Sequence, residues 1–297
     1  MAESFAHKWG QIIGNLFQAS LREALQQAAD RHGLYLDYQR DRAARPGRKV
    51  SWQDRHGNSH DLDYVLERGG TDAVRGVPAA FIETAWRRYT KHSRDKAQEI
   101  QGAILALAET YSHLRPFLGV VLAGLFTEGS LEQLRSSGFT VAYVPYDVIT
   151  RAFATVGIDA AFGETTTEGA FRKKVKQYTG LKAAQVEQVK QALFSGPRQE
   201  GGAQPPEGHP MQQFLVTLEA SLSRGVQGVT VIVLHGSPQQ LPTVQHAIDY
   251  LLRYDDSRPF TAPALKYEVD LRYNNGDLIH AVFQQKTEAI RFLQTYA

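Results

Sequence analysis

The middle of the chain alternates between short apolar runs and helix-like stretches, and this alternation restricts the fold more than any other feature of the sequence. The run "VPAAFIETAW" at 77–86 is typical of a strand, 93–114 has a helical period, and "FLGVVLAGLF" at 117–126 is typical of the next strand. A helix-like segment at 129–138 precedes a further strand from 139. Strands separated by helices of this length indicate βαβ units and at least partly parallel pairing. We therefore expect an α/β protein with a mixed central sheet flanked by helices.

The N-terminal part adds a long helix, a basic loop and a hairpin to this pattern. Apolar positions recur with a helical period over residues 4–31. The stretch "RDRAARPGRK" at 40–49 has five basic residues against one acid and a central Pro-Gly, so it is typical of a basic loop. The pattern over 51–70 predicts a hairpin with its turn near Gly57 and with Asp63 inside a strand.

A segment of unusual composition separates the last third of the chain from the rest. Residues 195–210 are rich in Gly, Pro and Gln and contain nothing to bury. Further helices and strands follow, and the Asn-Gly pair at 275–276 is a hairpin-turn signal. We expect a first domain over 1–195, a linker or long exposed loop over 196–210, and a smaller α/β domain over 211–297.

Composition excludes several classes of function. The chain of 297 residues has no cysteine, which rules out disulfides, thiolate nucleophiles and zinc sites with Cys ligands. It has no phosphate-binding loop, GxGxxG, HExxH or GxSxG motif. No stretch has the length of a membrane span, and the N-terminus lacks a signal-peptide core, so we expect a cytoplasmic protein without a membrane partner. The net charge is only +2, so any contact with nucleic acid has to come from local basic clusters.

Two acids beside a basic run form the candidate site. Glu83 lies in the middle of the run 77–86, where a carboxylate is costly to bury without a partner or a metal. Asp63 lies twenty residues earlier. Two carboxylates on adjacent strands can hold a divalent cation, which activates water and neutralises the charge that grows on a scissile phosphate. The simpler interpretation is that Asp63 faces water at a strand end and that Glu83 pairs with a buried Arg.

These residues resemble the PD-(D/E)XK, or restriction-endonuclease-like, superfamily over roughly residues 55–150, after a long N-terminal helix. The family pattern is an Asp, a variable interval, and then an acid, any residue and a lysine; Asp63 and Glu83 fit its two acids. The resemblance implies a restriction-endonuclease-like core and Mg²⁺-dependent cleavage of double-stranded DNA, with Asp63 and Glu83 holding the metal. It also implies a type II restriction endonuclease that acts as a homodimer and is encoded beside a DNA methyltransferase.

One position departs from the family pattern, because Ala85 stands where the family usually has lysine. In family variants the missing group comes from the following helix, where Lys96 and Glu99 are three residues apart and share one face. We therefore expect Lys96 to replace the catalytic lysine and Glu99 to be a migrated acidic ligand. Glu23, on the N-terminal helix, is a weaker candidate for an extra catalytic acid. A solvated helix charge is the simpler interpretation of Lys96.

Three basic clusters are candidates for contacts with DNA phosphates, and each has a solvated surface as its simpler interpretation. The candidate residues are Arg87, Arg88, Lys91 and Arg94 after Glu83, Arg45, Arg48 and Lys49 in the 40–49 loop, and Lys173 and Lys174 further along the chain.

Two other functions remain open. Ala85 favours a DNA-binding protein that keeps the fold without the activity. A repair or defence nuclease would recognise DNA structure in place of sequence. The domain at 211–297 is expected to serve recognition or dimerisation, since it lacks a matched acid pair flanked by basic residues.

Overall fold

The computed structural model divides the chain into two compact units. It describes residues 4–195, 209–233, 236–257, 266–274 and 276–297. The first unit comprises Met1–Thr110 and Pro116–Glu219, and the second comprises Tyr111–Arg115 and Ala220–Ala297. The linker expected at 196–210 lies almost entirely outside the described residues.

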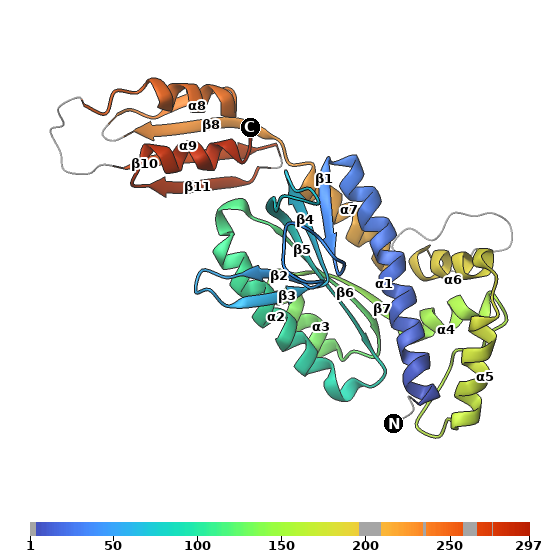
Figure 1. The fold of residues 1–297 in the computed structure, drawn as a ribbon. Coiled ribbons are helices and arrows are strands. Elements are labelled where there is room, and N and C mark those ends of the chain that lie inside the picture. Colours follow the sequence, from blue (N-terminus) through green and yellow to red (C-terminus); the bar gives the residue numbers. More distant parts are fainter. Residues whose placement is uncertain (1–3, 196–208, 234–235, 258–265, 275) are drawn as a thin grey trace. The chain divides into compact units, whose positions relative to one another are not determined.

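The first unit contains a mixed five-stranded sheet at its centre (Figure 1). The strands β1 and β5 each pair antiparallel with β4, which lies between them, whereas β6 and β7 run parallel to β5. The prediction of an α/β fold with a mixed central sheet flanked by helices is confirmed. In spatial order the strands are β1 (Leu34–Tyr38), β4 (Tyr64–Arg68), β5 (Val77–Arg87), β6 (Phe117–Gly124) and β7 (Thr140–Pro145).

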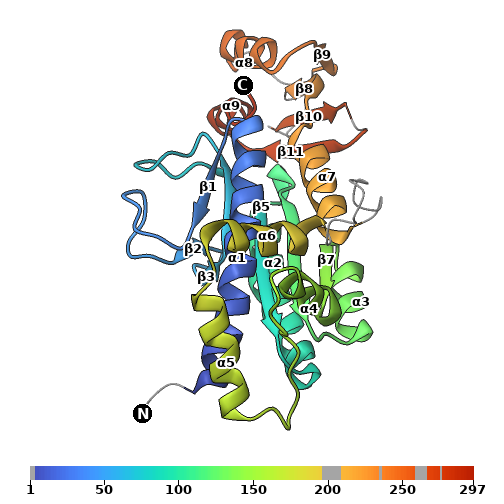
Figure 2. The ribbon, with the colours of Figure 1, turned by 90° about the vertical axis from the view of Figure 1, so that its right-hand side faces the viewer.

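Helices cover both faces of this sheet (Figures 1 and 2). On one face, α2 (Ser93–Thr110), which follows the short 3-10 helix η1 (Thr90–His92), packs beside α3 (Glu128–Ser136). Both helices connect parallel neighbouring strands, and right-handed crossovers place such helices on the same face. On the other face lie α1 (Phe5–Arg31), α4 (Tyr146–Ala154), α5 (Glu168–Thr179) and α6 (Ala183–Ser195).

The helix α1 buries one side of its surface, which is the amphipathic helix that the sequence predicts. Trp9, Leu21 and Leu25 of this side are fully buried. The helix α7 (Pro210–Leu222) begins in the first unit, where Phe214 packs edge-on against Phe117 of β6 with 5.5 Å between ring centroids. The two units therefore divide after Glu219, beyond the start at 211 that the sequence predicts for the second domain.

A two-stranded hairpin, β2 (Val50–Gln53) and β3 (Ser59–Leu62), precedes β4. Gly57 turns this hairpin with a φ of +83°, a left-handed conformation that favours glycine. The prediction of a turn here is confirmed. The prediction that Asp63 lies inside a strand is wrong, because Asp63 lies in a bend between β3 and β4. The chain has to change direction there, since β3 pairs with β2 whereas β4 pairs with β1 and β5.

The described part of the second unit contains a four-stranded antiparallel sheet with the helices α8 and α9. Its buried core includes Val231, Leu271 and Leu293. The turn expected between the last two strands contains Gly276, with a φ of +88°, whereas Asn275 lies outside the described residues. The elements are η2 (Ser112–Leu114), β8 (Val226–Val233), β9 (Gln239–Leu241), α8 (Val244–Arg253), β10 (Tyr267–Tyr273), β11 (Leu278–Phe283) and α9 (Lys286–Gln294), and the strand order is β11-β10-β8-β9.

Candidate active site

The candidate site lies in the first unit, at the point where β4 begins beside the longer strand β5. The pairing of β4 with β5 reaches Tyr64 opposite Ile82, whereas β5 continues along β6 as far as Arg87 opposite Gly124. A cavity of about 200 Å³ lies beside this extension of β5. Its walls combine both acids with residues of two helices: Gly14, Phe17 and Gln18 of α1, Asp63, Glu83, Thr84, Ala85, Trp86 and Arg87, and Lys96 of α2.

Asp63 and Glu83 are joined by a direct hydrogen bond at this cavity. The main-chain N–H of Asp63 donates to Oε1 of Glu83 over 3.0 Å. Oδ2 of Asp63 in turn accepts from the main-chain N–H of Thr84 over 2.8 Å and from its hydroxyl over 2.6 Å. The sequence prediction that these two acids lie together is therefore met by the geometry, although Asp63 reaches the site from a bend.

The environment of Glu83 disfavours its ionised form. Glu83 is 7 % exposed. Burial, followed by the charge of Asp63, raises the pKa of its carboxyl to about 8, while Lys96 acts in the opposite direction. Glu83 therefore holds a proton at neutral pH unless a cation compensates its charge. A buried carboxyl with a strongly raised pKa, placed in a cavity, is typical of a functional site.

Lys96 reaches the same cavity from α2, as a replacement for the lysine missing at Ala85 would have to do. Its side chain is 14 % exposed, and Nζ bonds Oε1 of Glu99 over 2.8 Å. Glu99 is 67 % exposed and does not line the cavity. Lys96 therefore lines the same cavity as the two acids. Glu99, which the sequence suggested as a metal ligand, lies outside the cavity and binds Lys96.

Two further residues of the site were missed by the sequence analysis. Thr84 is buried and binds Asp63, and Nε2 of Gln18 donates to the Thr84 hydroxyl over 3.4 Å. The main-chain oxygen of Gln18 accepts from the hydroxyl of Tyr64 over 2.9 Å. The position of Thr84 between Glu83 and Ala85 was a signal that was overlooked. Gln18 carries no signal in the sequence, because it differs in no way from other polar residues of α1.

The donor set suits a divalent cation that keeps part of its water shell. Each acid has one oxygen engaged by a donor, whereas Oδ1 of Asp63 and Oε2 of Glu83 accept no hydrogen bond from any described residue. Two carboxylate oxygens beside waters are a common way to bind Mg²⁺. A cation there would also compensate the buried charge of Glu83. No group of three or more acidic or histidine side chains that could hold a metal occurs within the described ranges. The carboxylates at this cavity are those of Asp63 and Glu83.

Glu23 does not belong to the site. Its carboxylate bonds Nζ of Lys190 on α6, and it does not line the cavity. Gly14, Gln18 and Glu23 lie on one helix, but Glu23 is five residues beyond Gln18 and so points away from the side that Gln18 shares with Gly14. The prediction of a catalytic role for Glu23 is therefore wrong.

Two of the basic residues expected to contact DNA are buried in ion pairs. Nε of Arg45 donates to Asp37 over 3.0 Å, and the Arg45 side chain is 1 % exposed. The Lys174 side chain is 9 % exposed and Nζ lies 3.3 Å from Oδ2 of Asp159. The predictions for Arg45 and Lys174 are wrong, because a side chain needs access to solvent to meet a phosphate.

The remaining basic candidates are distributed over the surface of the first unit. Arg88 stacks its guanidinium over the rings of Phe162, Tyr89 and Phe171, at 4.5, 4.9 and 4.9 Å from their centroids, which commits much of its surface to packing. Arg87 is half-buried and lines the cavity. The candidates that are exposed are Arg48, Lys49, Lys91, Arg94 and Lys173, of which Lys49 pairs with Asp61 over 2.6 Å.

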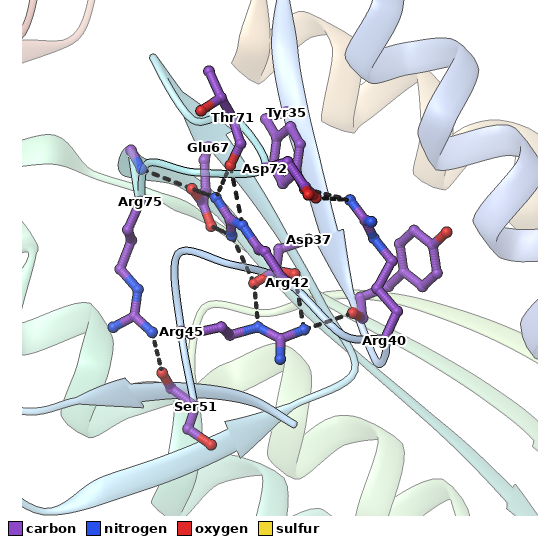
Figure 3. Close-up of polar contacts among 12 residues, drawn as sticks. Tyr35, Asp37, Arg40, Arg42, Arg45, Ser51, Glu67, Thr71, Asp72 and Arg75 are labelled. Atoms are coloured by element: carbon purple, nitrogen blue, oxygen red, sulfur yellow. Dashed lines mark hydrogen bonds and ion pairs between the residues drawn. The ribbon is translucent and has the colours of Figure 1, made fainter. Parts of the chain in front are cut away.

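A buried network of four charges joins the 40–49 loop to β1 and β4 (Figure 3). Nη1 of Arg42 lies 2.8 Å from Asp37 of β1 and 2.6 Å from Glu67 of β4, and Arg45 binds the same Asp37. Arg42 also donates to the main-chain oxygen of Thr71 over 2.8 Å. Two cations and two carboxylates balance one another, so the loop is fixed along the edge strand β1 without a net buried charge.

No protein-family model matches the chain, and no curated protein and no solved structure matches it significantly. Within the described ranges, no helix combines the length with the apolar composition that a membrane span requires.

Proposed function

We propose that this protein is a Mg²⁺-dependent nuclease that cleaves double-stranded DNA. The observation that carries the proposal is the bonded pair Asp63 and Glu83, with Lys96 of α2 at the same cavity. The raised pKa of Glu83 supports it, because a buried acid next to a second acid calls for a cation. The element order supports the resemblance to the PD-(D/E)XK superfamily: a long helix, antiparallel strands with the acids between and on them, a helix, and parallel strands.

Four residues of the cavity, together with Glu99, have roles in this proposal. Asp63 and Glu83 would hold the cation through Oδ1 and Oε2, and a bound Mg²⁺ would supply a Lewis acid that lowers the pKa of water and neutralises phosphate charge. Lys96 contacts a non-bridging oxygen of the scissile phosphate and stabilises the charge that develops on it. Glu99 holds the ammonium of Lys96 in place before DNA arrives. Arg87 binds a flanking phosphate.

Cleavage of a supercoiled plasmid tests this function. With Mg²⁺ the wild-type chain should produce nicked and linear DNA, and EDTA should stop the reaction. Glu83→Gln is the matched control, because its amide oxygen still accepts the bond from Asp63 while the charge is lost. Cleavage that persists in Glu83→Gln would place the activity elsewhere.

The finer assignment, a homodimeric type II restriction endonuclease of the cytoplasm encoded beside a DNA methyltransferase, rests on the family resemblance. A homodimer would place one cavity at each strand of the duplex. Discrete bands from plasmid DNA support sequence-specific cutting, whereas a smear supports a repair or defence nuclease that recognises DNA structure.

A second candidate function follows from Ala85, which lines the cavity where the family usually has lysine. In this case the protein binds DNA without cutting it. Binding to duplex DNA in Mg²⁺ with no product after long incubation would favour this function over cleavage.

A further inference from the structure

A chain of hydrogen bonds runs from α1 through β5 to Asp63. Nε2 of Gln18 donates to Oγ1 of Thr84 over 3.4 Å, and Oγ1 of Thr84 donates to Oδ2 of Asp63 over 2.6 Å. The main-chain N–H of Thr84 adds a second bond to the same carboxylate oxygen over 2.8 Å. Thr84 is 6 % exposed, so its hydroxyl is shielded from bulk water, whereas Gln18 is an exposed residue of α1.

The donors of this chain have a fixed direction. A hydroxyl has one hydrogen, and the Thr84 hydroxyl directs it to Asp63. Its oxygen is then an acceptor for the amide of Gln18, which has hydrogens to donate. Both links therefore point toward the carboxylate, and both strengthen its role as an acceptor with negative charge.

Gln18 also fixes the backbone next to Asp63. Its main-chain oxygen accepts the hydroxyl of Tyr64, the residue that follows Asp63, over 2.9 Å. Gln18 thus contacts both β4, through Tyr64, and β5, through Thr84, next to the bend at Asp63.

We infer that Gln18 and Thr84 are positioning residues that set the orientation of Asp63 for a divalent cation. This inference rests on the proposed function. With Oδ2 held by two donors of Thr84, the carboxylate cannot rotate, and Oδ1 is the oxygen left for the cation. A bend between two sheets has no ladder of its own to fix a side chain, so the orientation has to come from such contacts. Residues that orient metal ligands through hydrogen bonds commonly change metal affinity by roughly 10- to 100-fold when they are removed.

The test compares the affinity of the metal-free chain for Mn²⁺, measured from the electron paramagnetic resonance signal of the free ion. Thr84→Val has nearly the same shape and keeps the main-chain donor but loses the hydroxyl. We expect it to bind Mn²⁺ roughly 10-fold or more weakly. Thr84→Ser restores the hydroxyl and should bind within about 3-fold of wild type. Gln18→Met, which keeps side-chain length, should show a smaller loss because its effect passes through Thr84.

Ser20→Ala is the matched control. Ser20 is buried on α1 two residues beyond Gln18, and its hydroxyl bonds the main-chain oxygen of Leu16, so its loss should leave Mn²⁺ affinity unchanged. Tryptophan fluorescence shows whether each variant is folded, since Trp9, Trp52 and Trp86 all lie in the first unit. A role in stability alone would shift unfolding without separating the Val and Ser variants in affinity.

The outcomes separate this inference from the proposed function. If Thr84→Val binds Mn²⁺ as tightly as the wild-type chain does, the inference is overturned but the metal site is not. An equal loss of Mn²⁺ affinity in Thr84→Val and Thr84→Ser would have the same meaning. Absence of Mn²⁺ binding by the wild-type chain would overturn the metal site and the inference together. Loss in Thr84→Val with recovery in Thr84→Ser supports both.

Discussion

The main-chain N–H of Asp63 donates a 3.0 Å hydrogen bond to Oε1 of Glu83, so one proposed metal ligand is oriented by the backbone of the other. The two acids lie twenty residues apart in the chain. They meet because Tyr64, the first residue of β4, pairs with Ile82 of β5, so that Asp63 and Glu83 are the neighbours of a paired position. This bond uses no side-chain atom of Asp63. The charge of Asp63 and the position of Glu83 are therefore separable by mutation.

Asp63→Asn and Glu83→Gln should each reduce cleavage by more than about 100-fold while the fold is kept. Both changes preserve shape and the backbone bond but remove a negative charge that the cation needs. The measurement is single-turnover cleavage of a labelled duplex, with circular dichroism to confirm folding. Near wild-type rates in either variant would show that the acid is not a ligand.

The stability of the metal-free protein should fall as pH rises through about 8. The pKa of Glu83 is raised from its ordinary value of 4.5 to about 8, first by burial and then by Asp63. The folded state therefore binds the proton more tightly than the unfolded state, and this stabilisation is complete below about pH 4.5 and lost above about pH 8. We expect the midpoint of urea unfolding, followed by tryptophan fluorescence, to decrease over this range.

Glu83→Gln is the control for this pH dependence, because it cannot ionise. The stability of this variant should decrease less with pH. At pH 9 without metal, its free energy of unfolding should exceed that of wild type by roughly 1 to 3 kcal/mol. Mg²⁺ should restore wild-type stability at the same pH. An equal decrease in wild type and Glu83→Gln would show that another group causes it.

Lys96 and Lys91 should have separable roles. Lys96 lines the cavity, whereas Lys91 is exposed in the turn before α2. Lys96→Met should slow single-turnover cleavage by roughly 100-fold with little loss of DNA affinity, because the ammonium stabilises charge in the transition state. Lys91→Met should weaken affinity and leave the single-turnover rate nearly unchanged. The reverse pattern would move the catalytic role to Lys91.

The pH profile of metal binding should shift in opposite directions in two variants of the Lys96–Glu99 pair. The positive charge of Lys96 lowers the pKa of Glu83, whereas the negative charge of Glu99 raises it. Lys96→Met should therefore move Mn²⁺ binding to higher pH, and Glu99→Gln should move it to lower pH, because the cation competes with the proton on Glu83. Shifts of the same sign in both variants would contradict the proposed electrostatics.

DNA binding should depend strongly on salt through the exposed residues near the cavity. Lys91 and Arg94 are both exposed, so each is accessible to a phosphate. Replacing both by Gln should reduce the slope of log affinity against log salt by up to about 2, since each lost phosphate contact removes about one unit. Lys173→Gln, on α5, tests whether the duplex extends to that helix. A slope unchanged in the double variant would exclude Lys91 and Arg94 as phosphate contacts.

Arg42→Met should destabilise the first unit by roughly 3 to 5 kcal/mol, because it leaves Asp37 and Glu67 buried with one cation between them. Arg48→Met is the matched control in the same loop, since Arg48 is exposed, and it should change stability by less than about 0.5 kcal/mol. Urea unfolding followed by tryptophan fluorescence compares the two. Similar midpoints would mean that the buried network contributes little.

The sequence by itself determined the features that depend on local pattern. The period of apolar residues placed β5, α2 and β6 close to their observed positions, and Gly57 indicated its turn. An acid within a buried strand singled out Glu83, because a carboxylate there breaks the pattern and needs a partner. These features are properties of a few neighbouring residues, which is why one sequence is enough to find them.

The tertiary structure decided which polar side chains meet. Arg45 and Arg48 stand three residues apart in one basic loop, yet Arg45 is buried on Asp37 and Arg48 is exposed. Gln18 joins the site only because α1 packs beside Tyr64, which follows the bend at Asp63, and beside Thr84 of β5. The free energy of a charged or polar side chain depends on partners brought together from distant segments, and no local pattern specifies those partners.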